Sequence, residues 1–287
     1  MDNPQAWYYG RDRYPENPFI TGGHNGPGTN RKRNYLGIMA KSGSTFLYVG
    51  VEAIKKGVSE VPFIMARLDN LIQHGYTIEK VLADRWFPTY EMFAELDVRG
   101  ISYVGPYKKY APIKRIIESY LKNGGQYIIS YTIKGAPAKY YHSPHIQVTL
   151  ILTNRRGRRL REVREDFLTG KVSLKDSMKE IFVIVTNIAP PRGKKAQQGW
   201  AVKICHAYDP RWNIETGFRD LNRIGEISNA RKNVRKFFMF SLRFWVFNMW
   251  HLERAKRFRQ KHVPKSWRKG PTLRTFGYKV ALLEGCK

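Results

Sequence analysis

The chain has 287 residues, 42% hydrophobic and 14% aromatic, which is enough apolar material for one sizeable core. Its 51 Lys and Arg against 23 Asp and Glu give a formal net charge of +28, and this self-repulsion indicates an anionic partner, nucleic acid above all. The most apolar run, residues 237–252, contains Arg243 and is shorter than the ~20 residues of a spanning helix, so composition excludes a membrane-spanning protein.

The expected compartment is the cytoplasm. The two cysteines, Cys205 and Cys286, provide neither a disulfide framework nor a metal-binding spacing. The first residues, MDNPQAWYYGRDR, lack the apolar segment of a secretion signal. Both observations favour a reducing compartment.

The first 75 residues are predicted to hold an arm, a hairpin and a helix. Residues 1–32 are rich in Gly, Pro, Asn and Arg, which predicts an irregular arm. Two apolar runs, 35–40 and 46–53, predict strands joined by a turn at 41–44. A helix is then predicted between a cap at Ser59 and a stop at Gly75.

Strand and helix are predicted to alternate over the next part of the chain. The segment IEKVLADRWF predicts a short buried strand that ends at Asp84. A helix over 89–99, a strand over 101–105 and a helix over 112–122 follow it. This order favours an α/β sheet with parallel neighbouring strands.

The remainder of the chain is predicted to be strand first and helix afterwards. Three β-rich runs predict a mostly β insertion over 126–204, and its basic loops are either solvated faces or DNA contacts. Asp209 suits a helix N-cap and Pro210 the first helical position, and a long basic-aromatic helix is predicted over 230–260. We therefore expect four segments: 1–125 as the first part of an α/β core, 126–204 as the insertion, 205–260 as C-terminal helices, and 261–287 as a basic tail.

Two groups of residues are candidates for binding metal ions and phosphate. Asp84 is predicted at the carboxyl end of a parallel strand, where reactive groups collect in open α/β sheets. Further along, a carboxylate flanked by arginines lies on one predicted helix face, with spacings of 4, 4 and 3: Arg211, Glu215, Arg219 and Asn222. Such a face suits hard metal ions and phosphate together. Taken singly, however, Asp84 fits an ordinary turn, and Arg211 with Glu215 fits an ordinary ion pair.

The order of these groups resembles a known family. The segment YDPRWNIETGFRDLN resembles the Y-x2-R-x3-E-x6-K signature of one branch of the DDE-class insertion-sequence transposases. Tyr208, Arg211 and Glu215 match it in type and spacing, and Asn222 stands where the family has Lys. ADRWF resembles the motif of the family's second Asp, and Asp2 before WYYG resembles the surroundings of its first Asp.

The resemblance implies a fold and a chemistry. The fold would be a ribonuclease H-like core with a β-rich insertion before the catalytic Glu. The catalytic metal ligands would be Asp2, Asp84 and Glu215, which would hold two Mg²⁺ ions, with Mn²⁺ as a substitute. The DNA contacts would come from Tyr208, Arg211, Arg219, Asn222 and Trp86, although Trp86 also suits core packing.

The same resemblance implies how such a protein works. It would cut double-stranded DNA at terminal inverted repeats and join the freed 3′ ends to a target. It would act as a homodimer across two ends, in the cytoplasm and associated with the nucleoid of a prokaryote.

Three functions fit these observations. The first is an active transposase. The second is a catalytically dead, N-terminally truncated remnant that only binds DNA, because only Met1 precedes Asp2 and Asn222 replaces Lys. The third is a ribonuclease H-like nuclease that acts on RNA or hybrid duplexes, since the same carboxylates would serve it.

Overall fold

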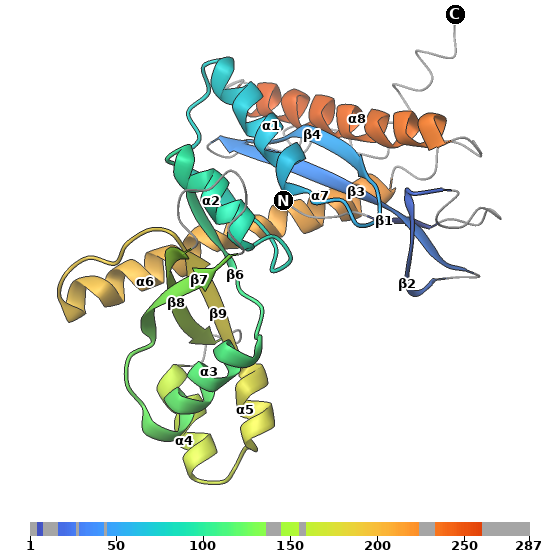
Figure 1. Ribbon diagram of the computed structural model, residues 1–287. Helices are drawn as coiled ribbons and strands as arrows, with labels where there is room; N and C mark the ends of the chain where they lie inside the picture. Colours follow the sequence, from blue (N-terminus) through green and yellow to red (C-terminus); the bar gives the residue numbers. More distant parts are fainter. Residues whose placement is uncertain are drawn as a thin grey trace, which may run out of the picture. The chain divides into compact units, whose positions relative to one another are not determined.

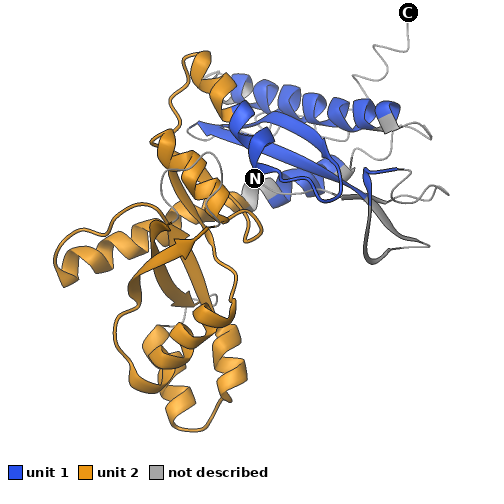
Figure 2. Ribbon diagram, viewed as in Figure 1, with its two compact units in different colours: residues 1–67, 212–287 blue, residues 68–211 orange. Residues whose placement is uncertain are grey.

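Two compact units make up the chain, and each is described by itself. The computed structural model describes residues 5–7, 17–26, 29–42, 45–135, 145–154, 159–223 and 233–259. One unit combines residues 1–67 with 212–287, and the other holds residues 68–211 (Figure 2). The predicted basic tail at 261–287 lies outside the described residues.

The first unit is built on one long strand, β3 (Thr29–Ser42) (Figure 1). It pairs antiparallel with β4 (Thr45–Ile54), and Ser42 opposes Thr45, which confirms the predicted hairpin. Alternate side chains of β3 point to opposite faces. Gly37 faces Phe218 of α7 (Trp212–Arg223), whereas Leu36 and Ile38 lie next to side chains of α1 (Val61–Gln73). Helices therefore cover both faces of this sheet.

The described residues within 1–32 do not form the irregular arm that we predicted. They include β1 (Gln5–Trp7), β2 (Ile20–Gly26) and the first residues of β3. Both strands pair antiparallel with β3. Gln5 of β1 lies opposite Asn34, and Ile20 of β2 lies opposite Arg33. Strand formation depends strongly on the neighbouring strand, so pairing overrides the low β-propensity of this Gly-rich and Asn-rich segment.

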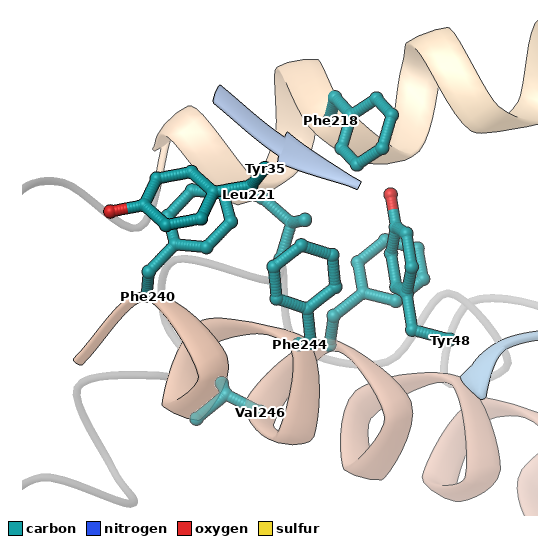
Figure 3. Close-up of a cluster of buried hydrophobic side chains, with 8 residues drawn as sticks. Tyr35, Tyr48, Phe218, Leu221, Phe240, Phe244 and Val246 are labelled. Atoms are coloured by element: carbon teal, nitrogen blue, oxygen red, sulfur yellow. The ribbon is translucent and has the colours of Figure 1, made fainter. Parts of the chain in front are cut away.

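Helix α8 (Asn233–Arg259) completes the core of the first unit and confirms the long helix predicted there. Its Phe240 ring stacks on Tyr35 with centroids 3.9 Å apart, and its Phe244 ring meets Tyr48 edge-on at 4.4 Å (Figure 3). From α7, Phe218 and Leu221 join this cluster. Residues from the beginning and the end of the chain thus share one aromatic core.

The second unit contains a five-stranded sheet in the order β5-β6-β9-β8-β7. β5 (Lys80–Leu82) and β6 (Ser102–Pro106) pair in parallel, as predicted. The other three strands pair antiparallel and lie where the β-rich runs predicted them: β7 (Ile128–Lys134), β8 (His145–Asn154) and β9 (Ile181–Thr186). The predicted α/β class is confirmed.

Residues 126–204 contain more helix than we expected. Three helices follow β8 in this segment: α4 (Leu160–Leu168), α5 (Leu174–Glu180) and the start of α6 (Lys194–Tyr208). Its strands extend the sheet of β5 and β6 rather than forming a layer of their own. The segment is therefore not mostly β. Its strands need helices to cover their apolar faces, and Ala201 and Ile204 of α6 pack against β6, β8 and β9 in this way.

The helices α2 (Tyr90–Val98) and α3 (Ala111–Asn123) agree with prediction, and Thr89 caps α2 by accepting a hydrogen bond from the Met92 amide. The helix predicted to begin at Asp209 is different. The chain is helical from Lys194, and residues 209–211 form a short 3₁₀ turn, η1, before α7. Pro210 has no amide hydrogen to donate and crowds the preceding turn, so the α-helix tightens there instead of starting.

Among the described helices, none has both the length and the apolar character that crossing a bilayer requires.

Candidate active site

Asp84 lies in the loop that follows β5, next to the end of the parallel strand β6. Its main chain forms a turn, in which the Phe87 amide donates to the Asp84 carbonyl at 3.0 Å. Its carboxylate oxygen Oδ1 accepts a hydrogen bond from the Arg85 amide at 2.7 Å. The turn therefore fixes the side chain, which stays 23% exposed and within reach of solvent.

Arg211, one of the residues of the predicted signature, lies next to the Asp84 carboxylate. Its Nη2 lies 3.3 Å from Oδ2 of Asp84, and only 12% of its side chain is exposed. Its guanidinium carbon lies 5.7 Å from the centroid of the Tyr208 ring. Three residues predicted from distant motifs, Asp84, Tyr208 and Arg211, thus meet within the second unit.

Sequence analysis missed Tyr103 of β6, which lies beneath this group. It is fully buried, and its hydroxyl has no hydrogen-bond partner among the residues that the structure describes. Burial raises the pKa of Tyr103 well above its ordinary value, and nearby Tyr208 and Asp84 add to the rise while Arg211 opposes it. In the sequence Tyr103 is one more large residue in a buried strand, so no signal separated it from core residues.

A basic-aromatic pair stands beside the Asp84 loop. Trp86 is 63% exposed, so the core-packing role that we weighed for it is wrong. The ammonium nitrogen of Lys108 lies 3.6 Å from the centroid of the Trp86 ring, a cation–π contact. Because β5 and β6 are parallel, the loops after them meet at one edge of the sheet, and sequence alone did not pair these two side chains.

The remaining predicted residues lie elsewhere in the chain. Glu215 and Arg219 are exposed on α7 of the first unit, whereas Phe218 and Leu221 of the same helix are buried. Asn222 also belongs to α7, but its side chain lies outside the described part of the structure. Asp2 lies outside the described residues altogether.

The donor atoms suit a divalent cation by type. Mg²⁺ prefers carboxylate oxygens, and Asp84 and Glu215 both offer partly or fully exposed carboxylates. Within the described ranges, no group of three or more His, Cys, Asp and Glu side chains could hold a metal ion. Oδ2 of Asp84 faces the Arg211 guanidinium, so a cation at that oxygen requires the guanidinium to move.

Comparisons with known proteins agree with this picture. The sequence model of the family described as "Transposase DDE domain" matches residues 18–249. Among solved structures, a piggyBac transposase in a synaptic complex with hairpin DNA is similar at 11% identity, with a TM-score of 0.55, over 97% of this chain and 51% of that one. The chain therefore spans about half the length of that transposase, and the likeness supports a ribonuclease H-like fold. No curated protein matches the chain.

Proposed function

The chain belongs to the transposase DDE domain family, and on that premise we propose that it cuts DNA at the ends of a mobile element and joins them to a target. The meeting of Asp84, Tyr208 and Arg211 carries the proposal. It sets a carboxylate, which can hold a metal ion, beside a guanidinium, which can bind a phosphate.

The carboxylates of Asp2, Asp84 and Glu215 are proposed to hold two Mg²⁺ ions, or Mn²⁺ in their place. When bound, such ions activate the attacking hydroxyl and stabilise the leaving oxygen. The turn at Asp84 supports its part in this task, because the Arg85 amide fixes one carboxylate oxygen, while the other lies 3.3 Å from Nη2 of Arg211.

Phosphate binding is assigned to the basic side chains of the signature. The planar guanidinium of Arg211 matches two phosphate oxygens, and Tyr208 lies against it. Arg219 and Asn222, on α7 of the first unit, are proposed to contact the DNA backbone as well. Trp86 is proposed to stack on a base that leaves the duplex, and its exposure together with the Lys108 ammonium supports this role.

Double-stranded DNA is the proposed partner, both as terminal inverted repeats and as target. The formal charge of +28 supports this choice, because phosphate neutralisation supplies most of the affinity for DNA. Joining two ends to one target calls for two active sites, so we propose that a homodimer acts on the DNA.

A cutting assay tests the proposal. The substrate is a labelled duplex that carries the sequences flanking the gene on both sides, incubated with Mg²⁺ or Mn²⁺. Wild type and Asp176→Asn should cut it, whereas Asp84→Asn should not. Asp176 is a matched control because it lies on α5, exposed and paired with Lys179.

Two outcomes would redirect the assignment. Undiminished cutting by Asp84→Asn would remove Asp84 from the site. Salt-sensitive binding of DNA by wild type, with no cutting in either metal, would favour the alternative function of a remnant that only binds DNA.

A further inference from the structure

The oxygen of Asp84 that would take a metal ion already faces a cation. Oδ2 lies 3.3 Å from Nη2 of Arg211, and both side chains are largely removed from solvent, at 23% and 12% exposure. Screening by water is therefore weaker than at an exposed pair, and the attraction is correspondingly stronger.

Metal and guanidinium compete for this oxygen. Both are cations, so a guanidinium at ion-pair distance from a carboxylate oxygen repels a divalent ion that approaches the same oxygen. Arg211 also has an alternative anion, because its planar fork fits phosphate as well as carboxylate. A DNA phosphate near Tyr208 would draw the guanidinium away from Asp84.

We propose that the Asp84–Arg211 ion pair couples the two ligands: without DNA, Arg211 weakens metal binding at Asp84, and a DNA phosphate that engages Arg211 releases the carboxylate for the metal. This coupling rests on the proposed function, in which Asp84 binds metal and Arg211 binds phosphate. It restrains the cutting chemistry until DNA is in place.

Thermodynamic linkage makes the coupling measurable from either side. If DNA strengthens metal binding by a given factor, metal strengthens DNA binding by the same factor. The coupling should be smaller when Arg211 loses its charge, because DNA then has no guanidinium to draw away from the carboxylate.

The test measures Mn²⁺ affinity rather than activity. Free Mn²⁺ is followed by electron paramagnetic resonance with the full chain, with and without a short DNA duplex, and the Asp84-dependent site is defined by comparison with Asp84→Asn. Without DNA, Arg211→Gln should bind Mn²⁺ at this site roughly tenfold more tightly than wild type, equal to ~1.4 kcal/mol. Addition of DNA should tighten Mn²⁺ binding by wild type more than by Arg211→Gln, and the two tightening factors should differ by a similar factor.

Two further variants serve as controls for this measurement. Arg85→Gln makes the same charge change one residue from Asp84, where the contact to the carboxylate comes from the main chain, and should behave as wild type. Arg211→Lys keeps a cation at the site and should retain weak DNA-free binding of Mn²⁺, which holds the test open if Arg211→Gln unfolds.

Different results would overturn the coupling and the proposed function. Equal Mn²⁺ affinity of wild type and Arg211→Gln at a site that Asp84→Asn abolishes would overturn the coupling and leave the proposed function standing. Undiminished Mn²⁺ binding by Asp84→Asn would overturn both, because Asp84 would then not be a metal ligand.

Discussion

Gly105 leaves the space that the Tyr103 hydroxyl occupies beside Asp84 and Arg211. A β-carbon at Gly105 would collide with that hydroxyl and come within 2.8 Å of the Ala83 carbonyl oxygen. The need for glycine here is one of close approach, because its backbone is that of an ordinary strand residue.

The collision predicts a rescue. Gly105→Ala should lower the free energy of unfolding by roughly 1–3 kcal/mol, as overpacking does. Tyr103→Phe in the same chain should recover part of that loss, because it removes the colliding oxygen. Urea unfolding measures both, and Gly199→Ala serves as control, since a β-carbon there meets open space within helix α6. Equal losses in the single and double variants would contradict this account of Gly105.

His251 of α8 is the second residue with a measurable consequence. Burial, with a smaller contribution from Arg254, lowers the pKa of His251 to about 4, and its ring lies 4.3 Å from that of Phe247. The unfolded chain takes up this proton near pH 6.5, whereas the folded chain does so only near 4. The contribution of His251 to the free energy of unfolding is therefore fully present above about pH 6.5, and it is lost as the pH falls from there to about 4.

This sign predicts a pH-dependent melting temperature. Between about pH 7 and about pH 5, wild type should lose more thermal stability than His251→Gln, which cannot take up the proton. Scanning calorimetry across this range measures the difference. Parallel curves for the two proteins would show that His251 has an ordinary pKa.

The sequence alone identified part of the candidate site. Asp84, Tyr208 and Arg211 were identified because their types and spacings match a family signature. Tyr103 and Lys108 were not, because one has the pattern of a core strand residue and the other that of a solvated charge. Their roles depend on which loops meet, and that information is absent from local spacing.

At the scale of elements, α8 and β4 are joined by a side chain that acts like a neighbouring strand. The Tyr48 amide donates to Oδ1 of Asn248, and Nδ2 of Asn248 donates to the Tyr48 carbonyl, both at 2.7 Å. Among the described strands, β4 pairs only with β3. Asn248 thus satisfies backbone groups on the open edge of β4 and fixes α8 along it.

Loss of this amide should weaken the first unit. Asn248→Ala should reduce the free energy of unfolding by about 1–3 kcal/mol, because it leaves a backbone donor and acceptor unpaired. Val234→Ala, on the same helix and 80% exposed, should change it by less than about 0.5 kcal/mol. Denaturant titration of the two variants checks this, and similar values for both would show that the Asn248 contacts contribute nothing.

Elements with a strong local pattern were predicted and those that depend on distant pairing were not. The hairpin of β3 and β4 follows from two apolar runs separated by turn residues, and the parallel pair β5 and β6 follows from the strand-helix-strand order. Strand β2, with the sequence ITGGHNG, has almost no strand pattern and exists because β3 lies beside it. Helix α4 carries apolar residues at helical spacing, Leu160, Val163 and Phe167, but they lie within a basic run that was interpreted as a loop.

At the scale of the whole chain, the units do not follow the predicted divisions at residues 125 and 204. The N-terminal strands share a core with the C-terminal helices, as the hydrogen bonds between Tyr48 and Asn248, 200 residues apart, illustrate. Contacts at such separation leave no trace in local periodicity, and the contiguous divisions drawn from the sequence could not anticipate them.

The net charge of the chain predicts that DNA binding depends steeply on salt concentration. Raising salt from about 50 mM to about 200 mM should weaken binding of a DNA duplex by roughly 10³-fold or more, the effect of six or more neutralised phosphates. Fluorescence anisotropy with a labelled duplex measures the slope of log affinity against log salt. Affinity that ignores salt would contradict a binding surface built on the +28 charge.

Asp84 and Glu215 are proposed to serve one reaction, and a double-variant cycle of cutting rates tests whether they do. Residues that act as a unit have strongly non-additive effects. Metal-dependent cutting should fall to the same residual rate in Asp84→Asn, in Glu215→Gln and in the double variant. A double variant slowed by the product of the two single effects, or a Glu215→Gln protein that cuts like wild type, would contradict it.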